Sequence, residues 1–126
     1  MAFDEIDAYL FQWEETYKKG LLSFWILLQL ASRESYPYEM RAEIAAISGQ
    51  MMVVDDNSIY RALRRFDAAG LVESNPRQSG SGPPRRYFRL SAKGRALLAR
   101  FIRRNILTFQ GPEVKTIIEQ VLKQEA

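Results

Sequence analysis

The chain has 126 residues, 47% of them hydrophobic and 26% charged, and these values predict one compact domain with its own buried core. It contains no cysteine and no histidine, so disulfides, thiolate metal sites and the commonest general base are excluded, which argues against most enzymes. No apolar run approaches the roughly 20 residues that span a bilayer, and the acidic N-terminus does not resemble a secretory signal. We therefore expect a cytoplasmic protein that does not contact a membrane.

The predicted elements begin with helices. Hydrophobic residues at steps of three and four predict an amphipathic helix over residues 3–17, and Gly20 is expected to break it. Residues 21–32 are apolar nearly all round, which is typical of a central buried helix. Pro37 suits the first turn of a third helix over residues 36–49.

The next predicted helix, residues 56–69, has one apolar side and one polar side. Asp55 can cap its start and Gly70 can end it. At about 100° per residue, the polar side and its flanks hold groups that donate hydrogen bonds to bases and phosphates. These residues are Asn57, Ser58, Tyr60, Arg61 and Arg64. A polar face is also normal on any surface helix, so this pattern alone does not decide between the two interpretations.

A hairpin and two more helices follow. Residues 71–74 begin a strand, residues 75–84 form a loop rich in glycine and proline, and residues 85–90 return as the partner strand. Ser91 then caps a long helix that ends before Gly111, and a last amphipathic helix completes the chain. This order predicts a mainly α fold with a small two-stranded β wing, the winged helix-turn-helix.

The distribution of charge supports a nucleic-acid partner for this fold. Residues 57–104 hold twelve basic residues and two acidic ones, while the remainder of the chain is net acidic. Such asymmetry predicts a basic face for a polyanion, with an ordinary solvated surface as the alternative. Helix 56–69 would enter the major groove of double-stranded DNA, and the wing, residues 75–86, would contact the flanking backbone or minor groove. The wing residues expected at the DNA are Arg77, Gln78, Arg85 and Arg86.

Four segments spread over residues 19–98 also resemble a known family, the PadR-like transcriptional regulators. In order, they read KGLLSFWILLQLA, YPYEM, NSIYRALRRFDAAGLVES and GSGPPRRYFRLSAKGRALL. The resemblance implies a homodimeric DNA-binding repressor, often one that responds to a small hydrophobic molecule, stress or a metabolite. It further implies contacts to the DNA backbone from Tyr36, Tyr38 and Tyr60, and a basic residue at Lys19.

Two positions depart from the family pattern. Pro37 stands where glycine is usual, and proline is tolerated at a helix start. Arg61 stands where proline is frequent, and it adds a charge to the face of the recognition helix. This second departure indicates a different operator preference.

Apolar residues near both ends of the chain predict self-association. Together they form more hydrophobic surface than a three-helix core with a wing can cover, although the terminal helices could instead fold back on their own subunit. The resemblance implies that the helix after the wing pairs with terminal helices of a partner. The candidate interface residues are Phe3, Ile6, Leu10, Trp13, Tyr17, Leu97, Phe101, Leu107 and Ile118. Residues 1–18 and 92–126 would then be dimerisation segments around a DNA-binding domain of residues 19–91, and a dimer would bind a palindromic operator.

Several alternatives stay open at this stage. Trp13, Phe24, Trp25 and Phe101 could line an apolar cavity for a small hydrophobic effector, but aromatic residues at helical spacing are more often core. A constitutive repressor, or control by a protein partner, is equally compatible.

Two other classes of protein fit the sequence less well. A winged helix can be a protein-interaction module or an effector-controlled adaptor without sequence-specific DNA binding, but the arginine-rich recognition face argues against this. An enzyme is not expected, because the acidic residues are scattered over helix surfaces. No catalytic residue, metal or cofactor is predicted.

Overall fold

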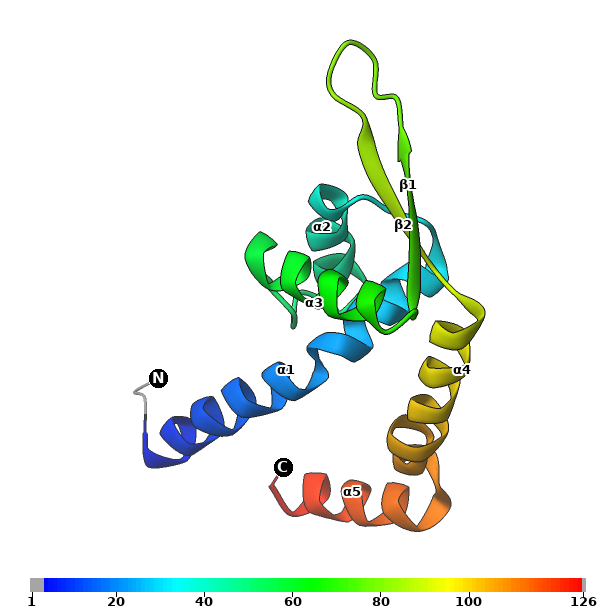
Figure 1. The fold of residues 1–126 in the computed structure, drawn as a ribbon. Coiled ribbons are helices and arrows are strands. Elements are labelled where there is room, and N and C mark those ends of the chain that lie inside the picture. The colour runs from blue at the N-terminus through cyan, green and yellow to red at the C-terminus, as the bar shows by residue number, and fades with distance from the viewer. Residues whose placement is uncertain (1–3, 126) are drawn as a thin grey trace.

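The computed structural model describes residues 4–125 and confirms the predicted fold class (Figure 1). The described chain is mainly helical with one two-stranded antiparallel sheet. The elements in order are α1 (Glu5–Ser32), α2 (Pro37–Ile47), α3 (Asp56–Ala68), β1 (Val72–Arg77), β2 (Arg85–Leu90), α4 (Ala92–Phe101), η1 (Ile102–Ile106), η2 (Leu107–Gln110) and α5 (Pro112–Glu125). Within this part of the chain, no helix is both long and apolar enough to cross a membrane.

The core lies where the second half of α1, α2, α3 and the base of the hairpin meet. Its largest fully buried apolar side chains come from the three helices: Ile26, Leu30, Met40, Ile44, Ile59 and Leu63. The sheet closes one side of this core through Val72 and Leu90, which pair with each other across the strands. The three helices are thereby fixed relative to the wing.

The predicted break at Gly20 is wrong, because α1 is continuous. Its N-terminus is closed by a capping box in which Asp4 accepts from the Asp7 N–H at 2.9 Å and Asp7 accepts from the Asp4 N–H. A glycine inside a helix costs only about 1 kcal/mol. Burial of side chains such as Ile26 in the second half of the helix offsets that cost.

The wing differs from the prediction in the length of its first strand. β1 continues through Pro76 to Arg77, which pairs with Arg85, so the loop covers residues 78–84 only. A proline is tolerated there because β1 is an edge strand. On the other side of β2, Ser35 forms an isolated antiparallel bridge with Phe88, so the link between α1 and α2 adds a third short segment to the sheet.

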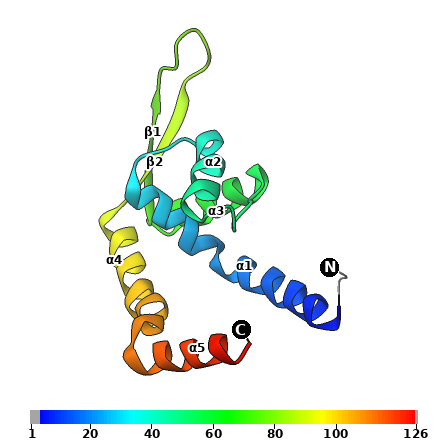
Figure 2. The same ribbon diagram turned by 180° about the vertical axis from the view of Figure 1, so that it is seen from behind.

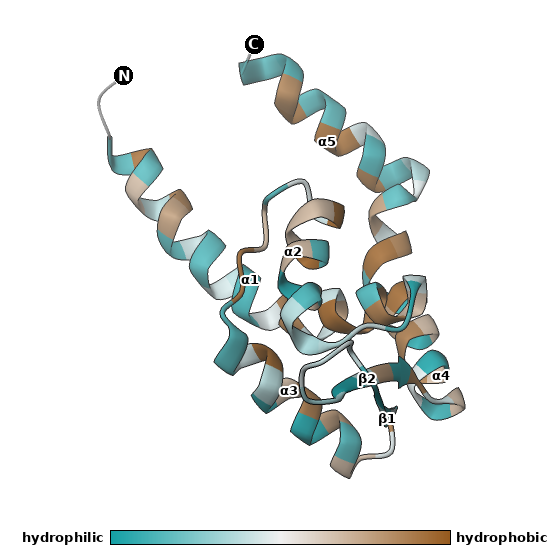
Figure 3. Cartoon of the chain, turned by 90° about the horizontal axis from the view of Figure 1, so that it is seen from above, coloured by the Kyte–Doolittle hydropathy of each residue, from teal (hydrophilic) through white to brown (hydrophobic). Residues whose placement is uncertain are grey.

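The long helix predicted after Ser91 is α-helical only as far as Phe101. It then widens into a π-helical turn over Ile102–Ile106, tightens into a 3-10 turn, and is followed by α5. Seen from behind, the first half of α1 and the unit of α4 and α5 project from the body in different directions (Figure 2). Hydrophobic residues recur along α5 (Figure 3), yet none of its residues is buried.

Candidate nucleic-acid interface

Helix α3 is held on the core by one face and capped at its start. Ile59, Leu63 and Phe66 are buried, and the Asp55 carboxylate accepts a hydrogen bond from the Ser58 N–H at 2.7 Å. This bond to the Ser58 N–H is the main reason why the pKa of Asp55 lies below its ordinary value of 3.8. The predicted cap is therefore present, and the burial of Ile59, Leu63 and Phe66 turns the opposite face of α3 to solvent.

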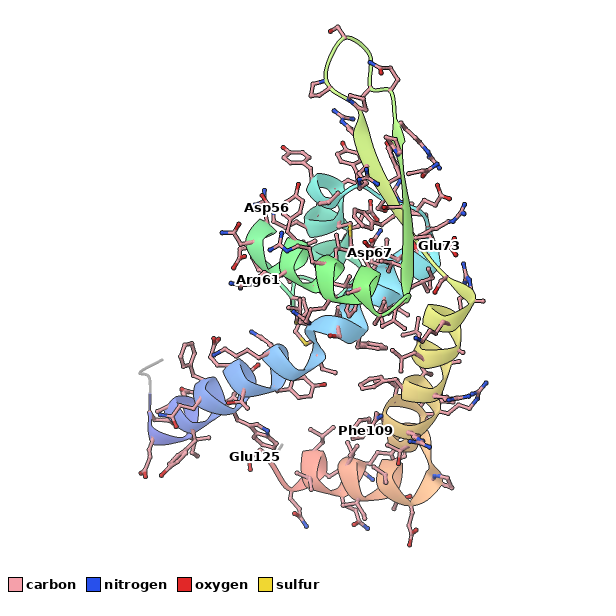
Figure 4. The ribbon with its side chains drawn as sticks, viewed as in Figure 1. Asp56, Arg61, Asp67, Glu73, Phe109 and Glu125 are labelled. Carbon is pink, nitrogen blue, oxygen red and sulfur yellow. The ribbon has the colours of Figure 1, made fainter. Side chains whose placement is uncertain are left out.

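The exposed face of α3 carries the predicted recognition residues. Asn57, Arg61 and Arg64 are exposed, Ser58 is half-buried, and Arg61 Nη2 lies 3.4 Å from the Ser58 hydroxyl. Arg61 points away from the body of the protein (Figure 4). The side chains that were expected to read base edges thus share one solvent-facing surface.

A shallow groove runs between α3 and the wing. We call it the inner groove, and its lining residues include Tyr60, Arg64, Ser74, Arg86 and Phe88. Arg86 Nη1 donates to the Ser74 hydroxyl at 3.0 Å, which directs its guanidinium along the groove. Arg64 and Arg86 bring positive charge from two different elements to this concave surface, which the Asp67 carboxylate also lines.

A second groove lies between the start of α2 and β2. We call it the tyrosine groove, and its lining residues include Tyr36, Tyr38, Tyr60, Arg85 and Arg86. The Arg85 guanidinium carbon lies 4.5 Å from the centre of the Tyr36 ring, and the Tyr36 and Tyr38 rings are stacked with centres 6.4 Å apart. Because Tyr60 and Arg86 line both grooves, the two form one continuous surface beside α3.

Three other predicted DNA-binding residues lie in different settings. Arg77 pairs with Glu34, and its guanidinium carbon lies 4.4 Å from the centre of the Tyr87 ring. The Gln78 side chain donates to two carbonyls within the wing loop, at 3.1 and 3.2 Å. Lys19 is exposed on α1 and lines a hollow beside Asp55 and Ser58, near the start of α3.

The sequence analysis did not identify Glu34 and Tyr87 as the residues that contact Arg77. Both belong to the wing sheet once Ser35 is paired with Phe88, because residues that flank a paired position point to the opposite face. The signal was the alternation of Glu34, Ser35 and Tyr36, which is too short to identify as a strand. Among residues 4–125, no cluster of three or more potential metal ligands occurs.

The predicted dimerisation residues are mostly exposed. Ile6 and Trp13 are 76% and 74% exposed, and the other exposed residues of this set are Leu10, Tyr17, Leu97, Leu107 and Ile118. Phe101 is half-buried because it stacks on Phe24, with ring centres 5.5 Å apart. Phe3 lies outside the described residues.

The aromatic residues considered for an effector cavity do not share one cavity. Phe24 packs edge to face on Trp25, and both belong to the rim of the core. Phe101 lines a hollow with Tyr17, whereas Trp13 lines a separate one with Tyr17 and Met51. The two hollows are open to solvent in the single chain.

Three helices, of which the third is the capped α3, and a two-stranded wing define a winged helix-turn-helix protein. The family model described as "Transcriptional regulator PadR-like family" matches residues 26–100, more than half of the chain. The protein belongs to the PadR-like family of transcriptional regulators, as the resemblance in its sequence indicated.

Solved structures share this fold. A PadR-family regulator from Eggerthella lenta is 22% identical, with a TM-score of 0.70 over 90% of this chain and 96% of that one. A PadR-like regulator from Bacillus cereus is 28% identical, with a TM-score of 0.62 over 82% and 93%. Bacillus subtilis PadR, solved in complex with operator DNA, is 20% identical with a TM-score of 0.60, over 65% of this chain and 46% of that longer one. In addition, an uncharacterised protein of Lysinibacillus sphaericus is 24% identical over 101 residues, 80% of this chain and 87% of that protein.

Proposed function

We propose that this protein is a homodimeric, sequence-specific DNA-binding repressor. The observation that carries the proposal is the convergence of an exposed polar face of α3 with two grooves in which arginines and tyrosines gather from α2, α3 and β2. A structural relative, Bacillus subtilis PadR, was solved in complex with operator DNA, which supports the same use of this fold here. Neither the family nor these relatives are described as enzymes.

In the proposed complex, α3 enters the major groove. Asn57, Arg61 and Arg64 have the donor groups that pair with adenine and guanine edges, and Ser58 can donate to a base or a phosphate. Arg85 and Arg86 would lie against the phosphates that flank the groove, with the hydroxyls of Tyr36, Tyr38 and Tyr60 beside them. The wing would thereby fix the register in which α3 reads the bases.

Self-association is proposed from the exposed apolar surface on α1 and α5. Helix α5 has no buried residue, and its hydrophobic residues Ile117 and Leu122 are 56% and 66% exposed. Its hydrophobic side therefore lacks a partner within the described chain. The first half of α1 presents a similar stripe that includes Ile6 and Trp13. A second copy would cover both, with residues 1–18 and 92–126 as its dimerisation segments around residues 19–91.

A dimer would place two recognition helices about one turn of DNA apart, roughly 34 Å, and would select a palindromic site. Repression would follow from occupancy of a promoter by such a dimer in the cytoplasm. The hollows beside Tyr17 would be enclosed by the same association, which would give a small hydrophobic effector or a protein partner a place to act.

The test is to select bound fragments from random double-stranded DNA with the purified protein at physiological salt, and to measure the mass of the complex. We expect a palindromic motif bound by two copies of the chain. Weak, steeply salt-dependent binding without any motif would contradict the proposal, because the basic surface would then read only the backbone.

A further inference from the structure

The two faces of the wing carry different chemistry. Residues that pair across the strands share a face, so Glu73, Asn75, Arg77, Arg85, Tyr87 and Arg89 form what we call the outer face. The opposite face carries Val72, Phe88 and Leu90 and packs on the core. Glu73 lies on the side of the wing away from Arg61 of the recognition helix (Figure 4). Glu34 and Tyr36, which flank the paired Ser35, extend the outer face on the far side of β2.

Continuous contacts link the charged residues of this outer face. Arg77 lies over the ring of Tyr87 and pairs with the Glu34 carboxylate. The second oxygen of Glu34 lies 3.8 Å from Arg89, and Arg89 also pairs with Glu73 at 3.0 Å. Two carboxylates thus neutralise two guanidinium groups on this face, one near the loop end of the strands and one near their base.

Arg85, which pairs with Arg77 at the loop end of the strands, and Arg86 have a different environment. Among residues 4–125, neither has a carboxylate within 4.0 Å; Arg85 lies over Tyr36, and Arg86 donates to Ser74. The wing therefore holds four arginines of two kinds. Arg77 and Arg89 are matched by acids, whereas Arg85 and Arg86 keep their full charge for a phosphate.

We propose that Glu34 withholds Arg77 from DNA, so that the wing contacts phosphates through Arg85 and Arg86 and non-specific DNA affinity is kept low. This inference rests on the DNA-binding function proposed above. Glu34 thereby sets how many phosphates the wing neutralises, and with it the salt dependence of binding, although it touches no base.

The physical reason is a competition between two anions for one guanidinium. If Arg77 turned to a phosphate, it would lose its contacts with Glu34 and the Tyr87 ring, and Glu34 would keep only Arg89, at 3.8 Å, as a partner beside a polyanion. Non-specific complexes depend almost wholly on the number of phosphates that cations neutralise. Removing one cation from that number therefore lowers the affinity for operator and non-specific DNA by a similar factor and makes both less dependent on salt.

A double-mutant cycle in the full chain tests this proposal. The variants are Glu34→Gln, Arg77→Ala and their combination, each titrated against an operator duplex and a scrambled duplex between 50 and 200 mM salt. We expect Glu34→Gln to steepen the salt slope by about 0.9, which is about a 3- to 4-fold larger loss of affinity over that range. Arg77→Ala alone should leave the slope unchanged, and the double variant should return it to the wild-type value.

Two further variants make the result specific. Glu73→Gln removes the same charge from the same face but leaves the Arg77–Glu34 pair intact and Arg89 beside Glu34, so its slope should equal that of the wild type. Arg85→Ala should reduce the slope by about 0.9 for both duplexes.

The outcomes that overturn the inference are distinct from failure of the proposed function. A reduced slope in Arg77→Ala would mean that Arg77 contacts phosphate. An unchanged slope in Glu34→Gln, or a slope raised equally by Glu73→Gln, would mean that Glu34 does not withhold Arg77. The DNA-binding function itself fails if wild-type protein binds neither duplex or if Arg85→Ala binds both as tightly as wild type does.

Discussion

Gln29 and Ser35 form a fully buried hydrogen bond, in which Gln29 Nε2 donates to the Ser35 hydroxyl at 2.7 Å. The backbone of Ser35 is paired with that of Phe88 in β2 through bonds of 3.1 and 2.8 Å. Ser35 thus links helix α1 to the wing in addition to their shared core.

Replacing Ser35 by alanine should destabilise the protein by about 1–3 kcal/mol, because the buried amide of Gln29 would lose its partner. The Gln29 oxygen already has no hydrogen-bond partner within residues 4–125, so nothing else compensates for the loss. Urea unfolding followed by circular dichroism measures the change. The matched variant Gln29→Leu/Ser35→Ala should recover part of it, since both polar groups are then absent. An unchanged midpoint in Ser35→Ala would show that the bond contributes nothing.

Gly94 packs so closely on the turn after α3 that a side chain does not fit. A Cβ at this position would lie 2.1 Å from the Leu71 carbonyl oxygen. Gly94→Ala should therefore force the start of α4 away from Leu71 and destabilise the fold by about 1–3 kcal/mol. Gly20→Ala is the matched control, because a Cβ there meets nothing within 4 Å and should stabilise α1 by about 0.5–1 kcal/mol. Thermal unfolding of the two variants should shift in opposite directions, and similar shifts would contradict this account.

The close packing at Gly94 belongs to a larger contact between residues 69–71, after α3, and residues 91–94, at the start of α4. Lys93 donates to the Ala69 carbonyl at the end of α3 at 2.7 Å, and the Ser91 hydroxyl donates to the Gly70 carbonyl at 2.6 Å. The sequence segments AGL, residues 69–71, and SAKG, residues 91–94, therefore form the two sides of one contact. Their order could be noticed from sequence, but the contact itself depends on the fold.

Local rules predicted the recognition helix but not α1. The start of α3 was predictable because Asp55 caps it through a bond that depends only on neighbouring residues. The break at Gly20 was wrong because the tendency of one glycine is small beside the burial of residues such as Ile26 and Leu30. The sequence indicated that residues 21–32 are buried, but not that this burial keeps the helix continuous through Gly20.

The wing arginines show a second limit of sequence reasoning. Arg77, Arg85 and Arg86 look equivalent as a basic cluster, and only the pairing of strands reveals that Glu34 lies beside Arg77. Forty-three positions separate these two partners, so no local pattern could connect them. The surroundings of Phe24 and Trp25 were likewise set by packing against each other and the core.

The Asp55 cap of α3 makes the stability of the folded protein depend on pH. The pKa of Asp55 in the folded protein lies below its ordinary value of 3.8, so the cap contributes fully above the unfolded pKa and is lost as the pH falls through the folded value. Asp55→Asn can still accept the bond from Ser58 but cannot titrate. The difference in melting temperature between wild type and this variant should be largest near pH 7 and should shrink below about pH 4. A difference that stays constant from pH 7 to pH 3 would contradict the assignment.

Charge on the apolar stripe of α1 should separate the proposed dimer. Trp13→Glu replaces a side chain that is 74% exposed in the single chain by a carboxylate. Folding of the single chain should therefore be unaffected, while association of two copies is lost. Val53→Glu, at an 81% exposed residue outside α1 and α5, is the control and should remain dimeric. Sedimentation equilibrium distinguishes the two masses. A wild-type protein that sediments as a monomer, or a dimeric Trp13→Glu variant, would exclude this stripe as the interface.

Mutations should show that α3 reads the bases and that the wing contacts the DNA backbone. Asn57→Ala should reduce discrimination between the operator and a variant with one changed base pair by about 1–3 kcal/mol, because a donor to a base edge is lost while the phosphate contacts remain. Arg85→Ala should weaken binding to both duplexes by a similar factor, so the discrimination should stay close to that of the wild type. Competition titrations at one fixed salt concentration measure the ratio directly. If Arg85→Ala changed the ratio and Asn57→Ala did not, the wing would be the element that reads sequence and α3 would serve to position it.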